Sequence, residues 1–280
     1  MEQTAKTKTL NILRHYNLRA NKKLGQNFLI NDGVLAEIER TAEIKPEDII
    51  LEIGPGIGIL TERLVQSGCR KVIAVELDRR MQPILGELAK KHDNLEVIYQ
   101  DILQVDMQNI VGGCPFKVVA NLPYYITTPI IMHFLESNFN YERLLVMVQN
   151  EVAQRMASTP GSKAYGALSI AVQYRTEAQL ALKVMPESFI PQPSVDSAII
   201  VCKRRTQPAV QVQDEELFFR IVKAAFSQRR KVIANSLKNI GLTGEQTQVW
   251  LQLAGIDEKR RAETLSLEEF AALEKMYDKW

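Results

Sequence analysis

The sequence of 280 residues predicts an α/β fold with a doubly wound, mostly parallel sheet. Three observations support this prediction: short apolar segments recur, helical patterns separate the earlier ones, and a glycine-rich turn follows the first. Strands are expected near residues 49–53, 71–76, 95–99, 116–120, 143–149, 180–185 and 197–203. The last two lie close together around a proline-rich loop, so we expect an antiparallel hairpin at one edge of the sheet.

A change of pattern near residue 205 predicts a domain boundary. The strand signal stops after Arg205, and residues 207–213 are typical of a linker before helical patterns begin. We therefore expect a sheet domain over residues 1–205, which includes a basic N-terminal segment, and a small helical domain over residues 206–280. Within the second, Ser266-Leu267-Glu268-Glu269 has the spacing of a capping box that opens the last helix.

Composition excludes several classes of protein. The formal net charge is only +2, so overall charge does not indicate a nucleic-acid partner. Cys69, Cys114 and Cys202 are widely separated and odd in number, which favours a reducing compartment over a disulfide framework. The three histidines share no ligand spacing, so no metal is expected.

No apolar run approaches the roughly 20 residues that cross a bilayer, and no signal-like block begins the chain. We expect a cytoplasmic enzyme that does not bind membranes.

The glycine-rich turn Gly54-Pro55-Gly56-Ile57-Gly58 indicates a ligand site. Glycines let a ligand approach the backbone closely, and the start of the following helix offers unpaired N–H groups. Ile59 breaks the dinucleotide pattern G-x-G-x-x-G, and no Gly-Lys-Ser/Thr follows to make a phosphate-binding P-loop. A nicotinamide-dependent oxidoreductase is therefore disfavoured, and a different adenosine-containing ligand is expected.

Two acidic residues follow neighbouring strands of the predicted sheet. Glu76 ends the second strand, where an acid meets a ribose diol in doubly wound sheets, and Asp101 follows the third strand. Asp101 can accept a hydrogen bond from the adenine amine of the same ligand. Each acid also has a plainer interpretation: Glu76 as a solvated strand end, and Asp101 as a helix cap.

The tetrapeptide Asn121-Leu122-Pro123-Tyr124 directly follows the apolar segment 116–120 and suits recognition of an amino group on an aromatic ring. The Asn121 side-chain carbonyl and the Leu122 backbone carbonyl can accept the two N–H groups of an exocyclic amine, while Tyr124 stacks on the base. Pro123 keeps Leu122 out of the α region, so its carbonyl projects beyond the strand. The alternative is an ordinary strand-ending turn, for which N-x-P is common.

Two basic stretches contrast with the balanced overall charge. Residues 1–31 carry a single acid, Glu2, and residues 217–244 carry none. Charge runs are usually solvated faces, but two such stretches in a balanced chain also suit contacts to phosphates. The residues expected to make these contacts are Lys22, Lys23, Arg229, Arg230 and Lys231.

Six motifs occur in order along the chain. They are Gly25-Gln26-Asn27-Phe28-Leu29, the glycine-rich turn, Glu76, Asp101, the Asn121 tetrapeptide, and Phe189-Ile190-Pro191-Gln192-Pro193-Ser194-Val195-Asp196-Ser197. In this order the chain resembles the ribosomal RNA adenine dimethyltransferases over most of its length. Within them it is most similar to the bacterial enzymes that dimethylate two adjacent adenosines near the 3′ end of 16S rRNA.

The resemblance implies the methyltransferase version of the doubly wound, Rossmann-like fold, known as class I, and S-adenosylmethionine as the cofactor. The residues expected to contact the cofactor are Gln26, Asn27, Leu29, Gly54, Gly56, Glu76, Leu77, Asp101, Ile102 and Asn121. The residues expected to handle the target base are Asn121, Leu122, Pro123, Tyr124 and Phe189. The partner it implies is 16S rRNA in a small-subunit assembly intermediate, and we expect a monomer.

Phe189 lies in a loop framed by Pro186, Pro191 and Pro193. These prolines stiffen the loop, so we expect the ring to sandwich a flipped base against Tyr124. The alternative is that Phe189 covers the core.

Two other functions remain open. A large-subunit (23S) rRNA adenine dimethyltransferase that confers antibiotic resistance has the same chemistry and architecture, although Leu122 and residues 226–231 favour the small-subunit enzyme. A ribosome-assembly factor, in which binding is the main role, is the second alternative. The intact Asn121 tetrapeptide argues against a purely non-catalytic protein.

Overall fold

The structure is a computed structural model that describes residues 3–228 and 230–277. The chain divides into two compact units. The first contains Met1–Ala153 and Gln179–Arg204, and the second contains Gln154–Ala178 and Arg205–Trp280. The C-terminal part of the second unit begins at Arg205, and residues 154–178 group with it rather than with the sheet. Within the described ranges, no helix is long and apolar enough to cross a membrane.

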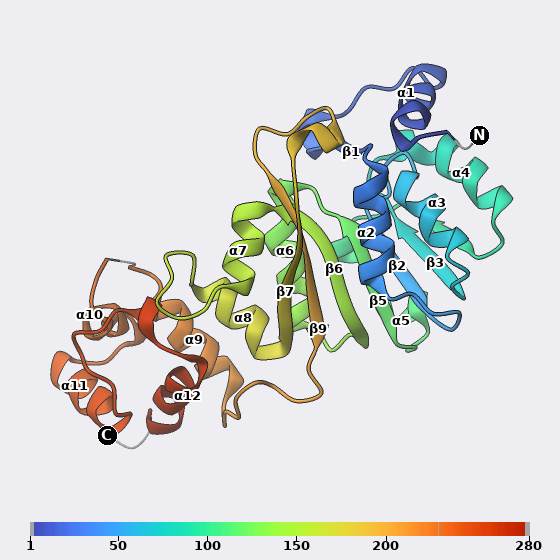
Figure 1. Ribbon diagram of the computed structural model, residues 1–280. Coiled ribbons are helices and arrows are strands. Elements are labelled where there is room, and N and C mark those ends of the chain that lie inside the picture. The colour runs from blue at the N-terminus through green and yellow to red at the C-terminus, as the bar shows by residue number, and fades with distance from the viewer. Residues whose placement is uncertain (1–2, 229, 278–280) are drawn as a thin grey trace. The chain divides into compact units, whose positions relative to one another are not determined.

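The first unit is built on a seven-stranded sheet in the order β4-β3-β2-β5-β6-β9-β7 (Figure 1). Its strands are β2 (Ile49–Ile53), β3 (Lys71–Val75), β4 (Leu95–Ile98), β5 (Phe116–Asn121), β6 (Tyr141–Gln149), β7 (Thr176–Val184) and β9 (Ser197–Arg204). The neighbouring strands β4, β3, β2, β5 and β6 pair in parallel, and β9 pairs antiparallel with β6. The predicted fold class is therefore confirmed, and β9 and β7 are neighbours at the edge as expected.

Helices cover the sheet because its central strands are mostly apolar and buried. Every residue of β2 is buried, which is typical of a parallel strand covered on both faces. The helices of this unit are α1 (Ala5–His15), α2 (Asp32–Ala42), α3 (Ile59–Gln66), α4 (Gln82–Lys91), α5 (Met107–Val111) and α6 (Thr127–Glu136). In α2, Asn31 caps the first turn, and Leu35, Ile38 and Ala42 bury one face against β5 and β6.

A two-stranded antiparallel sheet, β1 (Phe28–Leu29) with β8 (Phe189–Ile190), was not predicted. It pairs segments that are far apart in the sequence, with Leu29 opposite Phe189. The N–H of Ile30 donates to the carbonyl of Ser188 at 2.8 Å and extends the pairing. The N-terminal segment is therefore fastened to the proline-rich loop between β7 and β9.

The second unit has its own core. Its helices are α8 (Ala167–Arg175), α9 (Glu215–Ala225), α10 (Ile233–Leu237), α11 (Gly244–Leu253) and α12 (Leu267–Met276), and α7 (Asn150–Ala157) crosses the division between the units. The rings of Tyr174 in α8 and Phe218 in α9 stack 5.1 Å apart, which explains why residues 154–178 group with the C-terminal helices. The predicted capping box of α12 is confirmed: Ser266 and Glu269 exchange side-chain and backbone hydrogen bonds.

Candidate functional site

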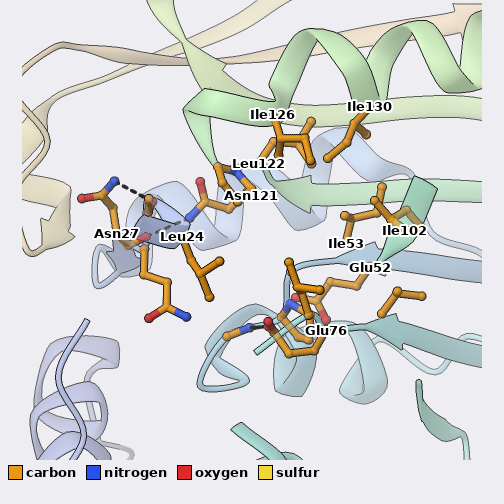
Figure 2. Close-up of a pocket in the computed structure, with 18 of the residues that line it drawn as sticks. Leu24, Asn27, Glu52, Ile53, Glu76, Ile102, Asn121, Leu122, Ile126 and Ile130 are labelled. Atoms are coloured by element: carbon orange, nitrogen blue, oxygen red, sulfur yellow. Dashed lines mark hydrogen bonds between the residues drawn. The ribbon is translucent and has the colours of Figure 1, made fainter. Parts of the chain in front are cut away.

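A cavity lies at the carboxyl ends of β2, β3 and β5, where doubly wound sheets bind ligands. Its wall includes every residue predicted to contact the cofactor, together with Leu122, Pro123 and Tyr124. Figure 2 shows Asn27 and Asn121 near each other on one side of this space and Glu52 and Glu76 on the other. The structure therefore brings together motifs that are spread over about a hundred residues.

The glycine turn after β2 leaves room beside its backbone. Gly54 has φ +67°, which favours glycine, and a Cβ placed there would meet nothing within 4 Å. At Gly56, also at positive φ, a Cβ would come within 3.2 Å of the Phe28 ring. The turn thus opens to the cavity at Gly54 and is closed by the N-terminal segment at Gly56.

Glu76 follows β3 and is only 5% exposed, which excludes a solvated strand end. Its two carboxylate oxygens are held by backbone donors: the Gly56 N–H at 2.9 Å and the Asp78 N–H at 2.7 Å. Burial raises the pKa of Glu76, and the two N–H donors oppose that rise. Each oxygen keeps a second lone pair, so the carboxylate can still accept from a ligand hydroxyl.

The helix-cap interpretation of Asp101 is confirmed, and its contact with a ligand stays a prediction. Its Oδ1 accepts from the Leu103 N–H at 3.0 Å and caps the short helix Ile102–Gln104, and the residue also lines the cavity. The cap fixes the carboxylate at the end of β4, so capping and ligand contact do not compete.

Asn121 is the last residue of β5, and its amide has a defined orientation. Its Nδ2 donates to the backbone carbonyl of Asn27 at 3.1 Å (Figure 2). A backbone carbonyl can only accept, so the nitrogen must face Asn27, and Oδ1 is left to accept elsewhere. The Leu122 N–H donates to the Met147 carbonyl of β6 at 3.0 Å, and Pro123 is extended, with ψ 133°. These bonds hold the strand end, and projection of the Leu122 carbonyl beyond the strand stays a prediction.

Tyr124 and Phe189 are not brought together at the cavity. Tyr124 is half-buried in the cavity wall, with its hydroxyl 2.6 Å from that of Ser197. Phe189 is 1% exposed, belongs to the core of the first unit and does not line the cavity. β8 pairs with β1, and the Phe189 ring is buried in the core, as the alternative interpretation expected. In this conformation Phe189 does not present a face to a base.

The N-terminal segment beside the cavity is held by side chains near Glu76. Gln26 donates to Asp78 at 2.8 Å, and its Oε1 accepts from the Asn21 N–H at 2.8 Å. Asp78 also forms an ion pair with Arg80, which keeps the pKa of that carboxyl below its usual range. Gln26 therefore ties the segment to the strand end that carries Glu76.

The residues predicted to contact phosphates lie in both units. Lys22 and Lys23 are exposed in the short helix Lys22–Leu24 of the first unit. Arg230 and Lys231 are exposed in the second unit. Arg229 lies outside the described residues.

Sequence reasoning missed Glu52, a wall residue within β2. It is 1% exposed, and among the described residues its Oε2 has no hydrogen-bond partner of normal geometry. Burial raises the pKa of Glu52 to about 8; the nearby Thr61 hydroxyl opposes this rise, and the charge of Glu76 adds to it. The available signal was an acid inside an otherwise apolar strand, because such groups rarely stay buried without a partner.

The family model of the ribosomal RNA adenine dimethylases matches residues 17–279. The chain belongs to this family. This chain, called the dimethylase below, is 47% identical over 266 residues to the ribosomal RNA small subunit methyltransferase A of Clostridium acetobutylicum. The match covers 95% of this chain and 96% of that relative. It is 48% identical to the protein of that name from Clostridioides difficile, covering 95% and 93%.

Two solved structures are similar to the dimethylase over most of its length. The 23S rRNA methyltransferase ErmE matches with a TM-score of 0.71 and 29% identity, covering 90% of this chain and all of that one. A dimethyladenosine transferase from Plasmodium falciparum matches with a TM-score of 0.74 and 25% identity, covering 90% and 97%. These likenesses agree with the methyltransferase version of the fold. In the part of the dimethylase that the structure describes, no three His, Cys, Asp or Glu side chains gather as they would around a metal ion.

Burial of Glu52 predicts that the ligand-free dimethylase loses stability as the pH rises. The folded pKa is about 8 against an ordinary value of 4.5, so the unfolded chain ionises first and stability falls between these values. Above pH 8, ionisation of Glu52 makes the free energy of unfolding lower by on the order of 5 kcal/mol than it is below pH 4.5. Glu52→Gln mimics the neutral acid. We expect it to raise the melting temperature at about pH 8.5 by at least roughly 5 °C.

Thermal unfolding followed by circular dichroism, without ligand, measures the melting temperatures of the parent and the variant. The difference between them should shrink steadily towards pH 5. A Glu52→Gln variant with the parent's melting temperature at both pH values would show that Glu52 is solvated or paired in solution.

Proposed function

We propose that this dimethylase transfers methyl groups from S-adenosylmethionine to the 6-amino nitrogens of two adjacent adenosines near the 3′ end of 16S rRNA. It acts as a monomer on a small-subunit assembly intermediate, in the cytoplasm where ribosomes assemble. The observation that carries the proposal is the fixed amide of Asn121, which leaves an acceptor at the strand end beside a cavity suited to the cofactor.

Several features of the cavity wall support S-adenosylmethionine as the ligand. Open space beside Gly54 accommodates the ligand, and Glu76 and Asp101 offer acceptors to ribose hydroxyls and to the adenine amine. Oε2 of Glu52 has no hydrogen-bond partner of normal geometry in the described part of the chain. It suits a cation, because an ammonium or sulfonium group nearby would favour its ionised form. Exposed Leu77 supplies an apolar surface for the adenine ring.

S-adenosylmethionine, when bound, supplies an electrophilic methyl group on a sulfonium centre. The residues of the chain orient the group that receives the methyl, which is an adenine amine whose lone pair is delocalised into the ring. Asn121 Oδ1 and the Leu122 carbonyl accept its two N–H groups and orient the lone pair, while Tyr124 stacks on the base. The alkylated amine is cationic and strongly acidic, so water can take its proton and no side chain is needed as a base.

The choice of small-subunit RNA rests on the degree of similarity. Relatives named as small-subunit methyltransferases are 46–48% identical to this chain, whereas the 23S rRNA methyltransferase ErmE is 29% identical. Both classes share the fold, so similarity in the site alone would not separate them.

Methyl transfer in vitro tests the proposal. Purified protein with radiolabelled S-adenosylmethionine would be offered unmodified small-subunit particles and, separately, large-subunit particles. We expect label in the 16S rRNA alone, as N6,N6-dimethyladenosine. Label in 23S rRNA would favour the resistance-type enzyme, and no label in either RNA would contradict the proposed activity.

Exposed Lys22 and Lys23 are proposed to contact RNA phosphates. If both become Ala, the slope of log affinity against log salt should shrink by about 1.4 for a single strand, because each lost contact removes roughly 0.7. Binding of labelled RNA over a range of salt concentrations measures the slope. Lys90 and Lys91, exposed at the end of α4, provide a control of equal charge. An unchanged slope in the Lys22/Lys23 variant would show that these cations only face solvent.

A further inference from the structure

The motif Phe189–Ser197 lacks a role in the cavity wall, because Phe189 is buried in the core and does not line the cavity. Its last residue nevertheless touches the site. The Ser197 hydroxyl lies 2.6 Å from the hydroxyl of Tyr124, and Tyr124 is part of the wall. At this distance the two groups form a short hydrogen bond in which either can donate.

Ser197 is itself fixed. It is fully buried, and it begins β9 opposite Gln149 of β6. The backbone carbonyl of the preceding residue, Asp196, accepts from the Asn150 N–H at 2.9 Å. The hydroxyl that Tyr124 meets therefore belongs to a strand end held on both sides of Ser197.

The same strand pair supports the backbone before Tyr124. Met147 of β6 accepts the Leu122 N–H at 3.0 Å, and Met147 lies opposite Ile199 of β9. Leu122 and Tyr124 are thus both anchored to the β6–β9 pair, one through its backbone and the other through its side chain. An anchored backbone leaves a tyrosine free to turn about its side-chain bonds, whereas a bonded hydroxyl fixes the far end of the ring.

We propose that Ser197 is a positioning residue that holds the Tyr124 ring in the orientation needed to stack on the target adenine. This inference rests on the proposed function, since it assumes that Tyr124 meets the base. The bond orients the ring before the base arrives, so no side-chain freedom is lost when the base stacks. Burial raises the pKa of Tyr124, which keeps its hydroxyl protonated.

Four variants of the full chain test this role: Ser197→Ala, Tyr124→Phe, the double variant, and Ser197→Thr, which keeps the hydroxyl. We expect each single removal to lower single-turnover methyl transfer about 5- to 10-fold with little change in KM. The double variant should be no slower than the slower single one, because both changes break the same bond. Ser197→Thr should recover most of the rate. Ser236→Ala, which removes an equally buried serine hydroxyl in the second unit, should keep the parent rate.

A spectroscopic readout separates ring orientation from general stability. RNA with 2-aminopurine at the target position fluoresces brightly when that base is unstacked and dimly when it lies on an aromatic ring. The bound complex of Ser197→Ala or Tyr124→Phe should be brighter than that of the parent, while both variants bind S-adenosylmethionine like the parent.

Parent-like transfer and fluorescence in Ser197→Ala, or additive losses in the double variant, would overturn the proposal. If Ser197→Ala does not fold, Tyr124→Phe decides the question, because it removes the other half of the bond without changing the buried serine. Failure of the proposed function would look different, since the parent itself would then transfer no methyl group.

Discussion

Asn121→Ala is expected to lower the single-turnover rate of methyl transfer by a factor on the order of 10²–10³. The change removes one of the two acceptors proposed to shape the adenine amine. It also removes the donor to the Asn27 carbonyl, but that carbonyl lies in a partly exposed segment where water can replace the lost bond. RNA affinity should therefore change by only a few-fold.

Asn121→Asp is the matched control for the orientation of the amide. It keeps the size and an acceptor oxygen, but it cannot donate to Asn27, and two acceptors would then face each other. We expect this variant to be nearly as slow as Asn121→Ala. A rate within a few-fold of the parent for Asn121→Ala, in a folded protein that binds RNA, would remove Asn121 from the proposed mechanism.

Glu76→Ala is expected to weaken S-adenosylmethionine binding roughly ten- to a hundredfold, which corresponds to about 1.5–3 kcal/mol for a charge-assisted hydrogen bond. The loss has two sources. The ribose loses its acceptor, and the N–H groups of Gly56 and Asp78 lose the carboxylate that fixes the turn. Isothermal titration calorimetry with S-adenosylmethionine measures the affinity.

Glu96 provides the control for this change. It is an exposed acid of neighbouring β4 that pairs with Lys71, away from the cavity wall. Glu96→Ala should bind S-adenosylmethionine like the parent. Parent affinity in a folded Glu76→Ala variant would show that the carboxylate is structural and that the ribose is bound elsewhere.

The sheet and most of the cavity wall could be predicted because both follow from local patterns. Apolar strands separated by helical segments specify the order of the elements, and the polar residue after each strand must lie at the carboxyl edge. Glu76, Asp101 and Asn121 were placed correctly in the cavity wall for this reason.

The features that were missed depend on contacts between distant segments. Two-residue strands such as β1 and β8 have no periodic pattern, so the sequence could not decide whether Phe189 stacks on a base or is buried in the core. The packing partner of an amphipathic helix is equally hidden in the sequence. Residues 154–178 were therefore assigned to the sheet domain, whereas they group with the C-terminal helices. Glu52 was overlooked because its strand was interpreted only as apolar.

Mapping of modified adenosines in ribosomal RNA tests the central claim most directly. Mass spectrometry of 16S and 23S rRNA would compare cells that contain this protein, cells that lack it, and cells that carry only Asn121→Ala. We predict two adjacent N6,N6-dimethyladenosines near the 3′ end of 16S rRNA in the first cells and unmodified adenosines there in the other two. Unchanged dimethylation in cells without the protein, or a loss confined to 23S rRNA, would contradict the account.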